Sequence, residues 1–514
     1  MSPPLLLLLF FLAKLTLSDA SVESDGLHVK TRLGPVSGSR PIPGVLQWLG
    51  IPYAVAGRWE APRFPESFRS TFPAASFGDA CPQLINPIVA NYLVLSHQND
   101  SIRESEDCLT LNIWTPSRRN VRNTPVLIWI HGGGFQFGTS GLKVYDAKRL
   151  VQSHDVTVVT INYRLNIFGQ PGAPQLVNPN VTQNFGLLDQ RAAVQWVFDN
   201  IASFGGDPAQ ITLVGHSAGA TSLALYTLAY PNDTLVKGLI EQSGSVYDLS
   251  NAASPTFDDG PWRTVAGVVG CGTEPTPDQL TCMKTIPWRD IIATILREGI
   301  PFVKLVTDDV LVFSNYQSRT EAGQFLRVPA LTGSLANDLD TFTVAANLAR
   351  RGNSPPFLTQ VISDISTQVT ITCPVSTISG IRAGLGVPTW RYYYEAIFPG
   401  ISTRSDLRAF HSSEIPLIFG TYRDISSSSS PEETALSNTI QAAWVAFAKN
   451  PTSGLTSLNW PKYDPSSDTL VQLGNRENQT GISFAPPRLL DATCDSIPKL
   501  LELRSQFSNL LSGV

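Results

Sequence analysis

The segment that most constrains the fold is the pentapeptide GHSAG at residues 215–219. It follows the apolar run 211–215, which is typical of a buried strand, and precedes residues 220–229, which favour a helix. A serine on so sharp a strand–turn–helix junction has strained backbone angles, and the flanking glycines give the turn its room. A bare GxSxG also occurs in ordinary glycine-rich turns. Here the flanking pattern favours a nucleophile elbow with Ser217 as the nucleophile.

A second glycine-rich segment, HGGGF at residues 131–135, directly follows the apolar run 126–130. Glycines let a backbone approach a substrate closely and turn its N–H groups toward a developing oxyanion. A flexible glycine loop is the alternative interpretation. Two such motifs, in this order and each at the end of a strand, favour an oxyanion hole.

Strands and helices alternate through the first half of the chain. Continuous apolar runs at 126–130, 157–162 and 211–215 are typical of strands buried on both faces. Between the last two runs, residues 189–204 carry apolar residues at helical spacing, namely Ala193, Val194, Val197, Phe198 and Ile201. The pattern predicts an α/β fold with a large, mostly parallel central sheet flanked by helices. Further strands are expected at 239–245, 328–334 and 389–398.

No domain boundary is evident after the N-terminal segment, so residues 21–514 are expected to form one domain with insertions. Residues 246–325 are Pro-rich and are expected to be less regular. Residues 5–13 are apolar, too short to span a bilayer, and typical of a signal-peptide core. We therefore predict a signal peptide over residues 1–20 and a secreted protein. No other run approaches the length of a transmembrane helix.

The order of residues limits the candidates for a catalytic triad. In α/β-hydrolases the triad runs Ser, acid, His along the chain. His411 is the one histidine of six that follows Ser217. The acid should follow a late strand, and both Asp338 and Asp340 follow the predicted strand at 328–334. A solvated acidic turn is the alternative interpretation of this segment.

Composition excludes some classes of function. The net charge is −5, with 37 basic and 42 acidic residues, and no Lys/Arg-rich block is present, which argues against a nucleic-acid partner. Charged residues make up 15% of the chain, so other groups must supply solubility. Glycans would do so, and sequons occur at Asn99, Asn180, Asn232 and Asn478.

Six cysteines would be oxidised in a secreted chain, and they allow fifteen pairings. Pairing neighbours is the simplest choice, giving Cys81–Cys108 and Cys271–Cys282 and leaving Cys373 and Cys494. No CxxC or HxxxH spacing is present, so no metal site is expected.

These motifs resemble the type-B carboxylesterase/lipase family, which includes cholinesterases and fungal secreted lipases. The resemblance covers most of the chain after the N-terminal segment. It implies an α/β-hydrolase fold and cofactor-free hydrolysis of a small-molecule or lipid ester. Besides the two glycine motifs, it rests on GIPYA (50–54), SEDCLTLNIWTP (105–116), NYRLNIFG (162–169), GLLDQRAAVQWVFDNIASFGGDP (186–208), EQSGS (241–245) and HSSEIPLIFG (411–420).

The resemblance assigns roles to particular residues. It makes Ser217 the nucleophile and His411 the general base. The oxyanion-hole N–H groups would come from Gly133, Gly134 and Ala218. The resemblance also supports the pair Cys81–Cys108, places Ser243 and Glu414 where they would support His411, and implies structural ion pairs between Arg58 and Glu106 and between Arg164 and Asp189.

The acid motif departs from the family pattern. Asp338 takes the position of the usual glutamate, one methylene shorter, and Leu339 replaces a glycine. Aspartate fills this role in other α/β-hydrolases, so activity is still expected. We predict Asp338 as the acid, with Asp340 as the second candidate.

The substrate is less constrained. Residues 82–107 contain no tryptophan, and His216 replaces an acidic residue that often precedes the nucleophile, so choline esters are disfavoured. The 81–108 loop is apolar, with Leu84, Ile85, Ile88, Val89, Tyr92, Leu93, Val94 and Leu95. It either packs on the body or acts as the lid of an interfacial lipase. Candidate walls of an acyl pocket are Phe135, Phe302 and Phe313.

An alternative of another class is a catalytically inactive adhesion or binding module on the same fold. Such relatives usually lose the nucleophile or another member of the triad. Because Ser217 and His411 are both present, the sequence favours an enzyme.

Overall fold

The structure is a computed structural model that describes residues 26–117, 123–248, 253, 256–300, 304–351, 356–426, 429–475 and 477–496. The predicted signal peptide at residues 1–20, and Phe302, lie outside the described residues. The strands of the central sheet are β3 (Val45–Pro52), β5 (Thr110–Pro116), β6 (Thr124–Ile130), β7 (Thr157–Ile161), β8 (Gly206–His216), β9 (Val236–Gln242), β10 (Ala330–Leu335), β11 (Thr389–Tyr394), β12 (Leu470–Asn475) and β13 (Asn478–Ala485).

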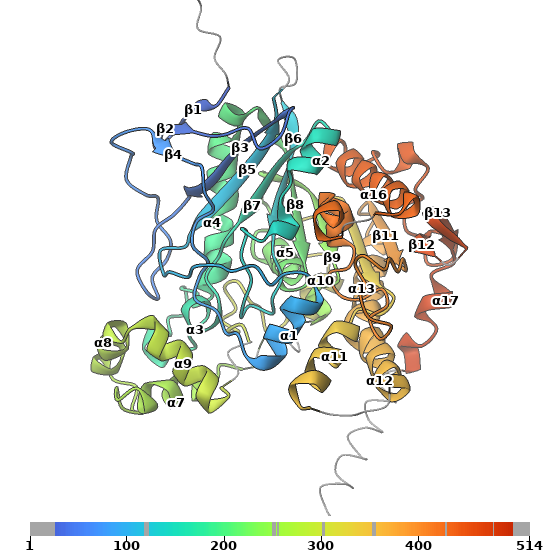
Figure 1. Ribbon diagram of the computed structural model, residues 1–514. Coiled ribbons are helices and arrows are strands. Elements are labelled where there is room, and N and C mark those ends of the chain that lie inside the picture. Colours follow the sequence, from blue (N-terminus) through green and yellow to red (C-terminus); the bar gives the residue numbers. More distant parts are fainter. Residues whose placement is uncertain are drawn as a thin grey trace, which may run out of the picture.

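Across the described chain these strands form one ten-stranded sheet in the order β13-β12-β11-β10-β9-β8-β6-β7-β5-β3 (Figure 1). The strands from β7 to β12 pair in parallel, and β3, β5 and β13 add antiparallel pairs at the two edges. A small second sheet holds β1 (His28–Thr31), β2 (Gly34–Ser37) and β4 (Phe72–Pro73). The predicted large, mostly parallel sheet is confirmed.

The central strand β6 shows why the apolar runs are continuous. Val126, Ile128 and Ile130 pack into a core with helices α4 (Phe185–Asn200) and α5 (Ala218–Ala229). Leu127 and Trp129 pack into a second core with α2 (Lys148–Ser153) and α16 (Pro431–Lys449). Because successive side chains of a strand point to opposite faces, a strand covered on both faces must be apolar at every position.

The predicted helix at 189–204 begins four residues earlier, as α4, and ends in a 3₁₀ turn, Ile201–Phe204. Four of its five predicted core residues are buried, but Phe198 is exposed. Phe198 follows Val197 by one position and therefore lies about 100° further round the helix, outside the buried stripe.

The segment 246–325 is more regular than predicted. It contains α7 (Gly260–Val268), α8 (Pro277–Thr285), α9 (Trp288–Glu298) and α10 (Tyr316–Glu321). Helices α7, α8 and α9 share a small core of their own with Trp262, Met283 and Ile291. The disulfide Cys271–Cys282 joins α8 to the residues just after α7. The segment was predicted to be irregular because its helices are short and therefore lack a long periodic pattern.

A group of helices covers the end of the molecule opposite the small sheet (Figure 1). These include α1 (Pro87–Leu95), α11 (Asp340–Ala349) and α12 (Pro356–Thr367), and α11 contacts both α1 and α12, whereas α13 (Cys373–Gly384) packs beside β10 and β11. No helix in the described part of the chain has the length and apolar character needed to span a membrane.

Three disulfides form in the structure: Cys81–Cys108, Cys271–Cys282 and Cys373–Cys494. The first closes the loop that contains α1. The third joins residues 121 positions apart, and links the start of α13 to the segment after α17 (Arg488–Asp491).

Loop length predicts the order in which these disulfides stabilise the fold. Replacing Cys373 and Cys494 by serine should lower the free energy of unfolding by about 5 kcal/mol in the chain-entropy model. Replacing Cys271 and Cys282, only 11 residues apart, should cost about 3 kcal/mol. Guanidinium denaturation without reductant, followed by far-UV circular dichroism, measures both losses. An equal loss for the two pairs would contradict the loop-length argument.

Candidate active site

The turn between β8 and α5 is held by close backbone packing. Ser217 has φ 56° and ψ −122°, and its N–H donates to Gln242 O at 2.8 Å. A Cβ on Gly215 would lie 2.4 Å from Gly219 O, and a Cβ on Gly219 would lie 2.1 Å from Ile130 O. Both positions therefore require glycine, and the elbow predicted from the sequence is present.

The HGGGF loop lies directly against this elbow. A Cβ on Gly132 would approach the Ser217 Cβ to 2.8 Å. Gly133 and Gly134 have φ angles of 109° and 60°, which favour glycine. A Cβ on Gly133 would collide with Phe137 O at 1.9 Å, whereas the space beside Gly134 is open. The loop after β6 thus places a backbone with left-handed glycine angles next to Ser217. The open space beside Gly134 leaves room for a substrate there.

His411 and Asp338 meet at the ends of separate loops. His411 Nδ1 lies 2.7 Å from Asp338 Oδ1, and the His411 N–H donates to the Asp338 carbonyl at 3.0 Å. Both side chains are buried. Because an ionised carboxylate only accepts hydrogen bonds, Nδ1 carries the proton. His411 Nε2 is buried with no hydrogen-bond partner among the described residues, so its lone pair is available.

The second oxygen of Asp338 is also held. Oδ2 accepts hydrogen bonds from Ser243 Oγ at 3.0 Å and from the Leu335 N–H at 2.8 Å. Ser243, predicted to support His411, therefore acts on it through Asp338. These bonds fix the carboxylate plane and so fix the imidazole that it contacts.

Asp340, the second candidate acid, points elsewhere. Its oxygens accept from Arg408 Nε at 2.9 Å and Nη2 at 2.8 Å, and from Ser363 Oγ at 2.7 Å. Arg408 also pairs with Asp364 of α12. Asp340 is thus part of an ion-pair cluster beneath α12.

Glu414 lies near the triad in a buried position. Gln242 Nε2 donates to Glu414 Oε1 at 2.9 Å, and Oε2 has no partner in the described part of the chain. Burial, followed by the negative charge of Asp338, raises the pKa of Glu414 to about 8. Glu414 is therefore protonated at neutral pH and adds no second negative charge to the site.

Sequence reasoning missed two ring contacts around His411. The His216 ring lies 4.3 Å from the His411 ring, and burial, reinforced by His411, lowers the His216 pKa well below its usual value. Tyr92 of α1 stacks on Phe342 of α11 at 4.8 Å, and the Phe342 ring lies 5.3 Å from His411. The sequence drew attention to His216 through its position directly before Ser217, but did not predict its contact with His411. No local pattern marked Tyr92, which the sequence grouped with the apolar residues of its loop.

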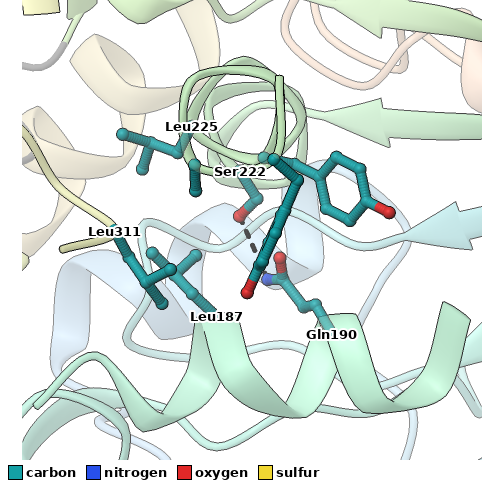
Figure 2. A pocket seen from close by; sticks show the side chains of 8 residues that line it. Leu187, Gln190, Ser222, Leu225 and Leu311 are labelled. Carbon is teal, nitrogen blue, oxygen red and sulfur yellow. Dashed lines mark hydrogen bonds between the residues drawn. The ribbon is translucent and has the colours of Figure 1, made fainter. Parts of the chain in front are cut away.

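Helix α5, which begins at the elbow, is anchored to α4. Gln190 Nε2 donates to Ser222 Oγ at 3.0 Å, with Leu187, Leu225 and Leu311 around this bond (Figure 2). The apolar surroundings make this bond costly to break, so it fixes the register of the two helices.

Other predicted residues fall in structural positions. The ion pairs Arg58–Glu106 and Arg164–Asp189 are both present. Phe135 and Phe313 are buried in the core that holds α4 and α5. Among the sequons, the side chains of Asn99, Asn180 and Asn232 are exposed, whereas Asn478 Nδ2 donates to Ile482 O at 3.1 Å.

A mostly parallel sheet with a strained serine between strand and helix, an adjacent glycine loop and a late His–Asp pair defines an α/β-hydrolase. The model of the carboxylesterase family matches residues 25–352 and 343–488. The chain belongs to the carboxylesterase family and is a carboxylic-ester hydrolase.

Several known proteins are similar to this chain. Chlorogenic acid esterase of Aspergillus niger is 33% identical over 87% of this chain and 90% of its own length. Secreted lipase 5 of Gibberella zeae is 31% identical over 77% of each chain. A solved structure of PNB esterase superposes with a TM-score of 0.73 and 27% identity, over 90% of this chain and 99% of its own.

The raised pKa of Glu414 predicts a pH-dependent stability. Because the pKa of Glu414 is higher in the folded protein than in the unfolded chain, its contribution to the free energy of unfolding is fully present below about pH 4.5. This contribution is lost as the pH rises to about 8. Glu414→Gln mimics the protonated form and should remove about 3 to 5 kcal/mol of that loss. Denaturant unfolding of both proteins at pH 5 and pH 8 measures the difference. Parallel pH profiles would show that Glu414 titrates normally.

Proposed function

We propose that the protein is a secreted serine esterase that works through an acyl-enzyme on Ser217. In the first step Ser217 Oγ attacks the ester carbonyl carbon while His411 Nε2 accepts its proton. The N–H groups of Gly133, Gly134 and Ala218 bind the oxyanion. The alcohol leaves with the proton from His411. Water, deprotonated by His411, then attacks the acyl-enzyme, the bond to Ser217 Oγ breaks, and His411 returns the proton to Oγ as the carboxylic acid leaves.

One observation carries this proposal. The His411 imidazole is held by Asp338 at 2.7 Å on one nitrogen, and its other nitrogen is buried and unpaired among the described residues. A buried unpaired acceptor is costly to keep, and a general base needs this arrangement. No cofactor is needed for this reaction.

Secretion is part of the same proposal. It is supported by the predicted signal peptide over residues 1–20 and by three disulfides, which persist in oxidising compartments. The mature chain, residues 21–514, would then be one hydrolase domain. The exposed Asn99, Asn180 and Asn232 are candidates for glycans. Asn478, whose amide is hydrogen-bonded, is a poorer acceptor.

An interfacial lipase with the 81–108 loop as lid is the second candidate. Val94 on α1 is 59% exposed, whereas Tyr92 on the same helix is buried beside Phe342. A helix that is apolar on both sides suits a flap, because it can pack on the protein when closed and contact lipid when open. A cavity of about 350 Å³ lies between this loop and residues 138–142, which gives the flap space.

Covalent labelling tests the nucleophile. The purified protein should hydrolyse p-nitrophenyl butyrate, and a serine-reactive phosphonate should stop it by modifying Ser217 alone. Peptide mass spectrometry locates the label, and heat-unfolded protein serves as the control. Absence of both turnover and label on Ser217 would overturn the proposal.

The two aspartates provide a matched pair of variants. Asp338→Asn should lower kcat by about 10⁴-fold, because the amide favours the wrong imidazole tautomer. Asp340→Asn should keep kcat within about threefold and lower the free energy of unfolding by about 1 to 3 kcal/mol, since Arg408 loses a partner. Steady-state kinetics with p-nitrophenyl butyrate and denaturant unfolding separate the two effects. Full activity in Asp338→Asn would transfer the acid role to another residue.

A further inference from the structure

Helix α12 has its polar and apolar faces reversed. Its buried positions are Thr359, Ser363 and Thr367, which recur every four residues. The large apolar residues of the helix are exposed: Phe357 at 76%, Leu358 at 49%, Val361 at 37%, Ile362 at 51% and Ile365 at 54% exposure. A surface helix of a soluble protein normally buries its apolar stripe. The arrangement in α12 is the opposite.

The inward face of α12 is polar because it binds the loop of the catalytic acid. Ser363 Oγ donates to Asp340 Oδ1 at 2.7 Å, and Thr367 Oγ1 accepts from the Leu339 N–H at 3.0 Å. Asp364 accepts from Asn337 Nδ2 at 3.0 Å. These bonds fix which side of the helix faces the protein. Rotating the helix to bury its apolar side would break these three bonds to Asn337, Leu339 and Asp340.

The apolar surface extends beyond one helix. Leu348 on α11, which packs beside α12, is 43% exposed. Val94 is exposed on α1, which contacts α11 from the other side. Figure 1 shows these three helices at one end of the molecule. Exposed apolar side chains gathered on one helix face, as on α12, mark an interaction site.

The charges near this surface indicate what it binds. Each of α11 and α12 has a single charged residue, Asp340 and Asp364, and both pair inward with Arg408. Arg350 and Arg351, just after α11, are the nearest cations along the chain. Two arginines are too few for the basic face by which amphipathic helices bind anionic lipids. The outer face of α12 therefore matches an uncharged oily surface.

We propose that α12 is the element by which this enzyme adsorbs to a neutral lipid–water interface, such as an emulsified ester substrate. The benefit of adsorption to the enzyme rests on the proposed esterase function, but adsorption to an interface does not itself require catalysis. The contact is made by the outer face of α12, with its inner face holding the acid loop in place. The enzyme would then present its site to esters gathered at the interface.

The test compares two double variants of similar exposure. Phe357→Ser with Ile362→Ser removes two apolar groups from α12. Phe64→Ser with Leu489→Ser removes an exposed phenylalanine and an exposed aliphatic residue, 59% and 73% exposed, from other parts of the chain. Because all four side chains are largely outside the core, both variants should fold, and circular dichroism checks this.

Adsorption is measured by flotation with hexadecane droplets, which contain no ester. The wild type and the Phe64/Leu489 variant should float alike, and the α12 variant should need at least about tenfold more droplet surface for half-maximal adsorption. Hydrolysis is measured on tributyrin below and above its solubility limit. The three proteins should act equally on dissolved tributyrin, and the α12 variant alone should be slower on the emulsion at limiting droplet surface.

Several outcomes would overturn the proposal. One is equal adsorption of the α12 variant and the wild type to hexadecane. Another is a dimeric wild type that the α12 substitutions make monomeric in light scattering, because a second copy would then cover the face. A third is an α12-dependent binding to phosphatidylserine vesicles without binding to hexadecane. If α12 mediates adsorption but no protein hydrolyses dissolved tributyrin, the esterase proposal fails and the adsorption proposal stands.

Discussion

The close packing of backbone around Ser217 is the constraint on which the site depends. A Cβ on Gly219 would overlap Ile130 O, and a Cβ on Gly215 would overlap Gly219 O. This packing joins the ends of β6 and β8 to the first turn of α5. It holds Ser217 at a positive φ, an angle that a free serine avoids. The glycine loop after β6 is placed by the same contact, so the positions of Ser217 and of the glycine backbone beside it are set together.

Burial then decides the charges around that serine. His216 is kept neutral, because burial and the neighbouring His411 both lower its pKa. Glu414 is kept protonated, with its pKa raised to about 8. These two buried groups therefore add no charge beside His411 and Asp338. In the proposed mechanism, a positive charge on the His411 ring would be stabilised mainly by Asp338, whose Oδ1 lies 2.7 Å from His411 Nδ1.

The sequence predicted those parts of the site that local patterns encode. The elbow, the glycine loop and the strands of the central sheet each have a short signature, because backbone angles and two-sided burial restrict residue types directly. Backbone angles and burial patterns did not separate Asp338 from Asp340, and the prediction of Asp338 rested on its position in the family's acid motif. The two carboxylates are only two residues apart, and what separates them is a contact with Arg408, 68 residues from Asp340. The helices of residues 246–325 were missed because each is short, and α7, α8 and α9 bury their apolar residues in a small core that they share.

Helix α12 shows a limit of reading periodicity alone. Phe357, Val361 and Ile365 recur at helical spacing, and the same spacing in α4 marks a buried stripe. Periodicity identifies which residues share a face, but not which face meets the protein. In α12 that choice is made by polar partners on the acid loop, which can be satisfied only if Ser363 and Thr367 point inward. The apolar face is thus exposed as a consequence of the bonds that α12 makes to Asn337, Leu339 and Asp340, and on our proposals one helix would both steady the loop of the acid and meet an oily surface.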